Sequence, residues 1–149
     1  MPPLTESQAR FLAGARVGRL ATADADGRPH AIPVCFAYAD LGYGGENIYV
    51  VLDQKPKTAE LTRLRRVRNI LANPHAALIV DHYDEDWRSL RYVLVSCQAS
   101  LLAGDEDEAA RAVALLREKY PQYRRMELDG NPVIKLTPQR YAAWSFSGE

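Results

Sequence analysis

The feature that most constrains the fold is a strand, turn and strand pattern early in the chain. Residues 17–23 (VGRLATA) alternate in the two-residue period of a half-buried strand. The Asp26-Gly27 pair that follows is typical of a hairpin turn, and residues 29–39 (PHAIPVCFAYA) form the predicted partner strand. Because proline cannot donate to a strand ladder, Pro33 indicates an edge or a bulge. The chain is therefore expected to begin its sheet with an antiparallel hairpin.

Further strand-like segments follow, with turn signals between them. Residues 48–52 (IYVVL) are β-branched and aromatic, and they predict a strand that is buried on both faces. The other predicted strands are 76–80, 92–102, 133–136 and 141–146.

Two helices are predicted near the beginning and the end of the chain. A capping box of Thr5 and Gln8 starts a short helix over residues 6–15. Asp105 is expected to cap a longer helix, residues 106–120. Six or seven strands and two or three peripheral helices predict a mainly β (α+β) fold, an antiparallel barrel with helices at its rim.

Size and composition fit one domain, residues 1–149. Basic and acidic residues balance at 19 each, so no overall field attracts nucleic acid. No apolar run approaches the roughly 20 residues of a membrane helix, and the first residues do not resemble a signal peptide. Cys35 and Cys97 lie in apolar runs and are expected to be reduced, buried thiols, with a single disulfide as the alternative. We expect a cytoplasmic protein without nucleic-acid or membrane partners.

Positive charge is concentrated in residues 55–68, although the chain as a whole is neutral. A solvated helix face is the ordinary explanation for such a run. Here, however, the run begins in the turn after strand 48–52, and the turn and the start of the following helix offer free N–H groups. The cations also lack acidic partners one helical turn away, and Glu60 is the one acid among them. These features favour an anionic ligand bound by Lys55, Lys57, Arg63, Arg65, Arg66 and Arg68.

The same region predicts a helix with one buried stripe that ends near Asn73 and Pro74. No aromatic residues interleave with its cations, so a stacking surface for nucleic acid is not favoured. The predicted stripe consists of Leu61, Leu64, Val67, Ile70 and Leu71.

The order of these segments resembles a known superfamily. A strand pair of the type GRLATADADGRPHAIPVCF is followed by IYVVLDQK and by a basic helix that ends in RVRNILANPHAALIV. This order is similar to that of the flavin-binding split-barrel proteins, which include the pyridoxamine-phosphate-oxidase-like proteins. The later segment VDHYDEDWRSLRYVLVSCQASLL most resembles the actinobacterial branch of deazaflavin (coenzyme F420)-dependent oxidoreductases. The resemblance covers about residues 10–146.

The resemblance implies a homodimer in which a flavin or deazaflavin ring lies between two subunits. The strand that contains Val50, Val51 and Asp53 would offer its backbone to the pyrimidine edge of the ring. The loop that carries Trp87 would reach the ring bound by the neighbouring subunit. Cations after the strand would hold the phosphate or the phosphoglutamate tail.

The resemblance also implies which basic residues contact the anionic tail of the cofactor. Residues 66–69, from Arg66 to Arg68 and Asn69, match a Lys-x-x-Asn-like segment in which Arg66 replaces the usual lysine. Arginine suits this position because its planar guanidinium grips phosphate bidentately. Extra residues lie between Lys55 and Arg66, so either Lys55 and Lys57 or Arg63 and Arg66 contact the tail.

The implied function is hydride transfer between coenzyme F420 and a small organic substrate. An FMN-dependent oxidase or reductase, or a non-enzymatic protein that binds a cofactor or a tetrapyrrole, is the alternative. Because the cofactor supplies the chemistry, no catalytic side chain is required. A bound water, His30 or a tyrosine could donate a proton, and the sequence does not choose among them.

A metal site is not expected. His82, Asp81, Asp84 and Asp86 are crowded in one loop, and the chain offers no second cluster of ligands. The sequence also lacks a nucleophile elbow, a GxGxxG motif and a phosphate-binding loop, which argues against serine hydrolase, Rossmann and nucleotide-triphosphatase chemistry.

Overall fold

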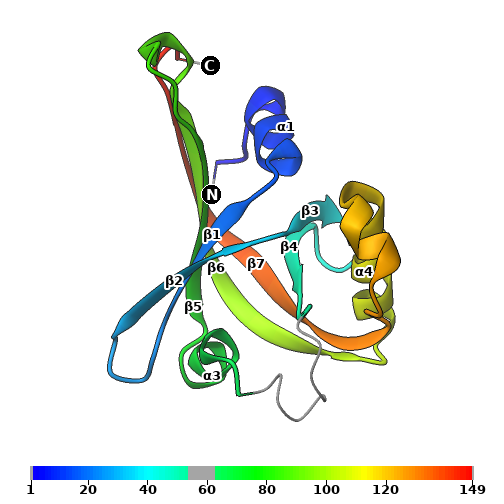
Figure 1. The fold of residues 1–149 in the computed structure, drawn as a ribbon. Coiled ribbons are helices and arrows are strands. Elements are labelled where there is room, and N and C mark those ends of the chain that lie inside the picture. The colour runs from blue at the N-terminus through cyan, green and yellow to red at the C-terminus, as the bar shows by residue number, and fades with distance from the viewer. Residues whose placement is uncertain (1, 54–62, 149) are drawn as a thin grey trace.

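The computed structural model of the chain describes residues 2–53 and 63–148 (Figure 1). Its helices are α1 (Glu6–Gly14), α3 (Arg65–Ala72) and α4 (Asp107–Lys119), with short 3-10 turns η1 (Trp87–Ser89) and η2 (Pro121–Arg125). Its strands are β1 (Gly18–Ala23), β2 (Pro29–Val34), β3 (Ala37–Asp40), β4 (Glu46–Val51), β5 (His75–His82), β6 (Arg91–Gly104) and β7 (Gly130–Ser145).

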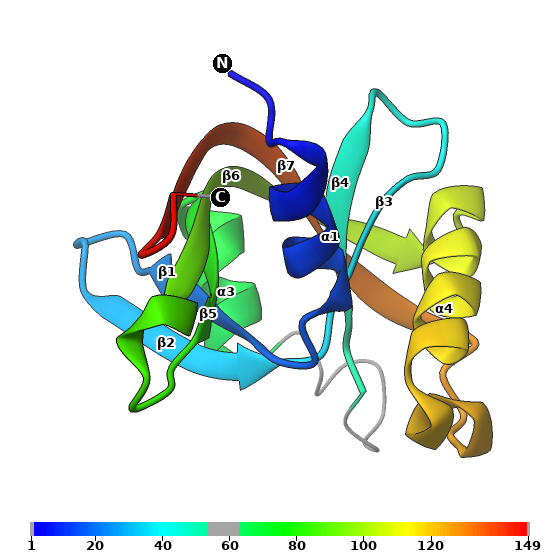
Figure 2. The ribbon, with the colours of Figure 1, turned by 90° about the horizontal axis from the view of Figure 1, so that it is seen from above.

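The seven strands form one antiparallel sheet in the order β2-β1-β5-β6-β7-β4-β3. The sheet bends strongly and curls around a core (Figures 1 and 2). Figure 2 shows α1 across one end of this barrel and α4 beside β3 and β4. The predicted antiparallel barrel of six or seven strands with peripheral helices is confirmed. None of the helices in the described ranges is long and apolar enough to cross a membrane.

The first hairpin forms as the sequence predicts. β1 pairs with β2 over their whole lengths, and Gly27 adopts the positive φ of 82° that the turn between them requires. The turn is held by the Asp24 carboxylate, which accepts hydrogen bonds from the backbone N–H groups of Asp26 and Arg28, each at 2.9 Å. Pro33 lies in β2, an edge strand, as expected.

The predicted strand 29–39 is wrong in one respect, because it divides into β2 and β3. Phe36 lies between these two strands, and its backbone groups form hydrogen bonds with a side chain and not with a neighbouring strand. Its N–H donates to the Tyr120 hydroxyl at 3.1 Å, and the same hydroxyl contacts the Phe36 carbonyl oxygen at 3.2 Å. Tyr120 follows α4, so a contact distant in sequence ends β2 and redirects the chain.

β4 is buried on both faces, as predicted. Ile48, Val50 and Leu52 face the core inside the barrel. Tyr49 and Val51 face a second core, which the strand shares with α4. Two layers of apolar side chains therefore fix the position at which β4 ends, and this position matters for the site described below.

The two C-terminal strands predicted at 133–136 and 141–146 are one strand, β7. β6 supplies a continuous partner of 14 residues along most of its length. The register shifts between Ser96 and Cys97, opposite Pro138, and this irregularity accommodates the proline without ending the strand.

Helix α3 differs from its prediction in its buried face. It spans Arg65–Ala72, and Leu71 is 65% exposed instead of buried. The helix turns Val67, Ile70 and also Asn69 toward the protein. The buried Asn69 amide donates to the Thr22 hydroxyl of β1 at 3.0 Å, which makes burial of this polar residue favourable. Leu61, which was also placed in the stripe, lies outside the described residues.

The cap of α4 also differs from its prediction. The N-cap residue is Glu106, and its carboxylate accepts from the backbone N–H of Ala103. Asp105 is therefore not the cap. The helix ends at Lys119, and Pro121 begins η2.

Candidate functional site

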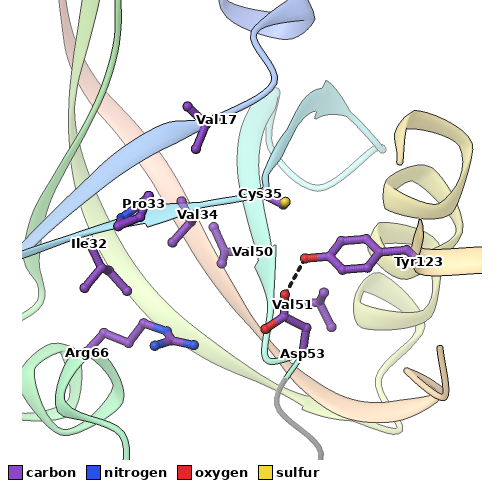
Figure 3. Close-up of a pocket in the computed structure, with 10 residues that line it drawn as sticks. All are labelled: Val17, Ile32, Pro33, Val34, Cys35, Val50, Val51, Asp53, Arg66 and Tyr123. Atoms are coloured by element: carbon purple, nitrogen blue, oxygen red, sulfur yellow. Dashed lines mark hydrogen bonds between the residues drawn. The ribbon is translucent and has the colours of Figure 1, made fainter. Parts of the chain in front are cut away.

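One cleft of the described residues, here called pocket 1, has a volume of about 400 Å³ (Figure 3). It lies between the β2–β3 connection, the end of β4, helix α3 and η2. Most of its wall is apolar and its lower end is polar. It is lined by Val17, Ile32, Pro33, Val34, Cys35, Val50, Val51, Asp53, Arg66 and Tyr123.

The polar end of pocket 1 contains one acid, one base and one hydroxyl. The Tyr123 hydroxyl donates to Asp53 Oδ2 at 2.6 Å, and Arg66 extends toward Asp53 from the opposite side (Figure 3). Burial and the hydrogen bond to Asp53 raise the pKa of Tyr123 far above its ordinary value. Tyr123 therefore remains protonated at neutral pH and acts as a donor. Burial lowers the pKa of the half-buried Arg66 guanidinium, and the charge of Asp53 opposes this effect.

Backbone contacts hold Asp53 at the end of β4. The N–H of Leu52 donates to the Pro132 carbonyl oxygen at 3.1 Å. The Asn131 side-chain amide donates to the Leu52 carbonyl oxygen at 2.8 Å. The residue immediately before Asp53 is thus bonded through both of its backbone groups, so the carboxylate projects from a fixed point.

Arg117 of α4 holds the segment that carries Tyr123. Its guanidinium donates to the carbonyl oxygens of Tyr123 and Met126, at 3.2 and 3.0 Å, and forms an ion pair with Asp129 at 2.9 Å. The Arg117 side chain therefore connects α4 with η2 and with the segment that follows η2. Sequence reasoning assigned Arg117 no such role.

The apolar wall of pocket 1 includes an open strand edge. The β3–β4 ladder ends at the pair formed by Ala37 and Tyr49, so Val50 and Val51 lie beyond it. Both valines pair with β7 on the other side of the strand. Among the described residues no strand pairs with this edge of Val50 and Val51, which is where the family resemblance implies contact with the ring.

A second cleft, pocket 2, lies between the β1–β2 turn and α3 and has a volume of about 470 Å³. Arg28 on its turn side pairs with Asp24 and Asp26, at 3.4 and 3.3 Å. Within the described ranges, Arg65 and Arg68 on its helix side have no carboxylate within 4.0 Å. Among the described residues, pocket 2 therefore presents two arginines that lack a carboxylate partner. It is lined by Asp24, Ala25, Asp26, Arg28, Arg65, Arg68, Asn69 and Ala72.

The structure brings most of the proposed binding residues into these two clefts. Val50, Val51, Asp53 and Arg66 line pocket 1, while Arg68 and Asn69 line pocket 2. Arg63 is exposed and lines neither cleft, and Lys55 and Lys57 lie outside the described residues.

Trp87 does not reach either cleft within one chain. Its side chain is 58% exposed on the connection between β5 and β6. Figure 1 shows this connection at the top of the molecule and α3 at the bottom. Its implied contact with a ring could therefore come only from a second subunit.

Sequence reasoning missed Tyr123 and Cys35 as lining residues of pocket 1. Tyr123 lies in a short turn about 70 positions after β4, and no motif marks it. Cys35 was expected to be buried in a continuous strand, but the break between β2 and β3 leaves it partly exposed in the pocket. Neither residue could be assigned to the pocket from the sequence, because tertiary contacts place both of them there.

The two thiols are expected to react differently. Both are free, but Cys97 is 1% exposed, and burial raises its pKa to about 12. A native-state assay with a chromogenic disulfide reagent should therefore modify one thiol per chain, Cys35, and unfolding should expose the second. Cys35→Ser should abolish the native reaction. Two rapidly modified thiols in the native protein would contradict this placement.

In the described parts of the chain, no three His, Cys, Asp or Glu side chains form a group that could hold a metal ion. Two of the acidic residues that were considered as metal ligands near His82 form ion pairs with arginines. Asp86 binds Arg88 at 2.8 Å, and Asp81 binds Arg19 at 2.9 Å.

Comparison with known families decides the classification of the chain. The family model described as pyridoxamine 5'-phosphate oxidase matches residues 4–145. The chain belongs to this family. The seven-stranded antiparallel sheet with helices at its rim, as described above for residues 2–53 and 63–148, is the split-barrel fold of the pyridoxamine 5'-phosphate oxidase family, as the sequence resemblance implied.

Proteins that resemble this chain differ in function. A curated reductase of 5a,11a-dehydrotetracycline and 5a,11a-dehydrooxytetracycline from Streptomyces rimosus is 26% identical over 153 residues, covering 99% of this chain and 87% of its own. A solved structure named F420 reductase has a TM-score of 0.63 and 22% identity, covering 93% and 98% of the two chains. The haem storage protein HutZ of Vibrio cholerae has a TM-score of 0.66 and 16% identity, covering 97% and 95%.

Proposed function

We propose that this member of the pyridoxamine 5'-phosphate oxidase family is an oxidoreductase that uses coenzyme F420. It would transfer a hydride between the deazaflavin ring and a small organic substrate. The relative from Streptomyces rimosus is a reductase, which supports the reaction class, and the F420 reductase with a similar structure supports this cofactor on the same fold.

The observation that carries the proposal is that helix α3 contributes to both clefts. Arg66 lines pocket 1, while Arg65 and Arg68 line pocket 2. A ligand with a flat ring and a long anionic tail would need one apolar and one basic binding surface, and α3 contributes residues to one cleft of each kind. FMN carries one short phosphate and would need fewer cations, so the basic surface favours the longer tail.

The apolar side chains of pocket 1 and the arginines of α3 would have different roles toward such a cofactor. When bound, the ring supplies the hydride chemistry. The apolar side chains of Ile32, Val34 and Val50 would contact the ring and exclude water from it. Arg65, Arg66 and Arg68 would orient the cofactor and offset its negative charge. No described side chain of pocket 1 needs to act as an acid or base in this scheme.

The experiment that tests the proposal is a set of separate titrations of the purified protein with coenzyme F420, FMN, FAD and haem. Ring absorbance and fluorescence would be followed at low and at high salt. Coenzyme F420 is expected to bind most tightly, and its affinity should fall as salt rises. Tight stoichiometric binding of FMN or haem without F420 binding would replace this proposal with the corresponding alternative.

We also propose that the chain forms a homodimer, as the resemblance implies. In Figure 1 none of the helices drawn lies to the left of the upper part of the β5, β6 and β7 ladder. Tyr92 and Trp144, 37% and 46% exposed, stack there with ring centroids 6.1 Å apart. Ile79 and Leu94 are paired neighbours on the same face. A second copy is the partner that would bring the Trp87 loop to another subunit's cleft.

Light scattering is expected to report the mass of a dimer at micromolar concentration. The dimer interface itself is expected to bury more than roughly 1,200 Å². Leu94→Glu places a charge on the proposed face and should shift the protein toward monomer. Ala114→Glu, at an exposed position on α4, adds the same single negative charge and should leave the dimer intact. A monomeric wild-type protein would rule out the shared site.

A further inference from the structure

A third cleft, here called pocket 3, has a volume of about 300 Å³ and lies between α1, β3 and α4. Figure 2 shows β3 between these two helices. Pocket 3 shares no lining residue with pocket 1 or pocket 2. Most of its wall is apolar, and the end of α4 adds two charged side chains. It is lined by Ala13, Ala37, Tyr38, Leu115, Glu118 and Lys119.

The Lys119 amine is half-buried and is held at a defined position. Its Nζ donates to the Phe36 carbonyl oxygen at 2.9 Å. The centroid of the Phe36 ring lies 3.9 Å from Nζ, so the ring excludes water from that side. Within the described ranges, no carboxylate lies within 4.0 Å of this ammonium. The amine therefore loses water without gaining an ion pair, which disfavours its charged form.

A second cation lies next to Lys119. The Arg16 guanidinium donates to the Lys119 carbonyl oxygen at 2.7 Å. Burial and then the charge of Arg16 lower the pKa of Lys119 to about 8, while Cys35 opposes them. The face of the Phe36 ring also attracts the cation. The charged or titratable side chains around the amine are those of Arg16, Cys35, Tyr38, Glu118 and Tyr120.

The charge state has a chemical consequence, because only a neutral amine is a nucleophile. With the pKa of Lys119 at about 8, about one amine in ten is neutral at pH 7. An ordinary lysine, with a pKa of about 10.4, is neutral in fewer than about one molecule in a thousand. Lys119 therefore combines a neutral fraction at physiological pH with an apolar cleft beside it.

We propose that Lys119 is a modification site, at which a small apolar aldehyde that enters pocket 3 forms an imine. Nζ bonds to the carbonyl carbon, and the carbonyl oxygen leaves as water with the two hydrogens of the neutral amine. No oxidant or reductant is consumed. The neutral amine can keep one N–H on the Phe36 oxygen while its lone pair stays available. This site goes beyond the proposed function, because it needs no redox cofactor.

The test treats the native protein with butanal and cyanoborohydride at pH 7, and peptide mass spectrometry measures the modification of each lysine. Cyanoborohydride reduces the imine to a stable secondary amine. Lys119 is expected to react about tenfold or more faster than Lys135, which is paired with Glu108. Unfolding in guanidinium chloride should remove this difference, because it depends on the folded surroundings. Lys119→Arg keeps the charge and should abolish the reaction at this position.

Two further variants separate the charge state of the amine from the cleft. Trace acetylation by acetic anhydride across a pH series measures the neutral fraction of Lys119, with an expected midpoint near pH 8. Arg16→Gln removes the neighbouring charge and should move this midpoint to higher pH. Leu115→Gln makes the wall of pocket 3 more polar and should slow butanal labelling about threefold or more without moving the midpoint. Leu71→Gln, at an exposed position on α3, is the matched control.

Either of two results would overturn the proposal. The first is equal butanal labelling of Lys119 and Lys135 in the native protein at pH 7. The second is an acetylation midpoint of Lys119 at the ordinary lysine value of about 10.4. Both measurements use the protein without added cofactor, so they leave the proposed function to be decided by the cofactor titrations.

Discussion

Replacing Arg66 by alanine is expected to weaken coenzyme F420 binding by about 10- to 100-fold. Arg66 is half-buried at the polar end of pocket 1, so solvent screens its charge less than that of an exposed residue. A charge-assisted contact contributes roughly 1.5–3 kcal/mol, and each 1.4 kcal/mol is about tenfold in affinity. Fluorescence titration of the coenzyme would measure the loss.

Neighbouring arginines provide graded comparisons for this variant. Arg65→Ala and Arg68→Ala should each cost less, about threefold to tenfold, because both residues are exposed. Arg10→Ala is a suitable control, since Arg10 is an exposed helix residue that pairs with Glu6 on α1. Arg117 would be a poor control because it holds the segment of Tyr123. If all the alanine variants from Arg63 to Arg68 bind like wild type, the basic segment is only a solvated surface.

Lys135→Met is expected to reduce the free energy of unfolding by about 3 kcal/mol. The Lys135 ammonium forms an ion pair with Glu108 at 2.8 Å, and the two side chains are 17% and 9% exposed. The variant would leave the Glu108 carboxylate buried without its cation. The Tyr49 hydroxyl, which donates to it at 2.7 Å, would offset that charge in part. Urea denaturation monitored by circular dichroism would give the difference in stability.

A second substitution tests whether the charge itself causes this loss. In the double variant Glu108→Gln/Lys135→Met, the amide oxygen can still accept from Tyr49, but no charge is buried. More than half of the lost stability should return. Equal stability of the single and double variants would show that packing around Lys135, and not the ion pair, joins α4 to the barrel.

Features set by local sequence were predictable. The capping box of Thr5 and Gln8, the hairpin turn at Gly27 and the edge position of Pro33 all depend on residues a few positions apart. The burial of β4 on both faces was also readable, because a run of β-branched and aromatic residues has no polar side to expose. Four of the proposed binding residues met in one cleft because β4 ends near α3.

Features set by contacts between distant residues were not predictable. The stripe assigned to α3 assumed an apolar buried face, but the helix is turned so that Asn69 reaches Thr22 across the core. Tyr120 ends β2 from more than 80 positions away. Tyr123 enters pocket 1 because Arg117 folds the chain back after α4. Each of these contacts depends on the packed structure and leaves no periodic pattern in the sequence.

The most direct test of the central claim compares coenzyme F420 with its deazaflavin chromophore lacking the phosphate-bearing tail. Both would be titrated into wild-type protein at low and high salt. If the ring occupies pocket 1 and the tail lies along Arg65 and Arg68, the complete coenzyme should bind at least about tenfold more tightly at low salt, and this advantage should shrink at high salt. Equal affinities for the two compounds, unaffected by salt, would contradict the account.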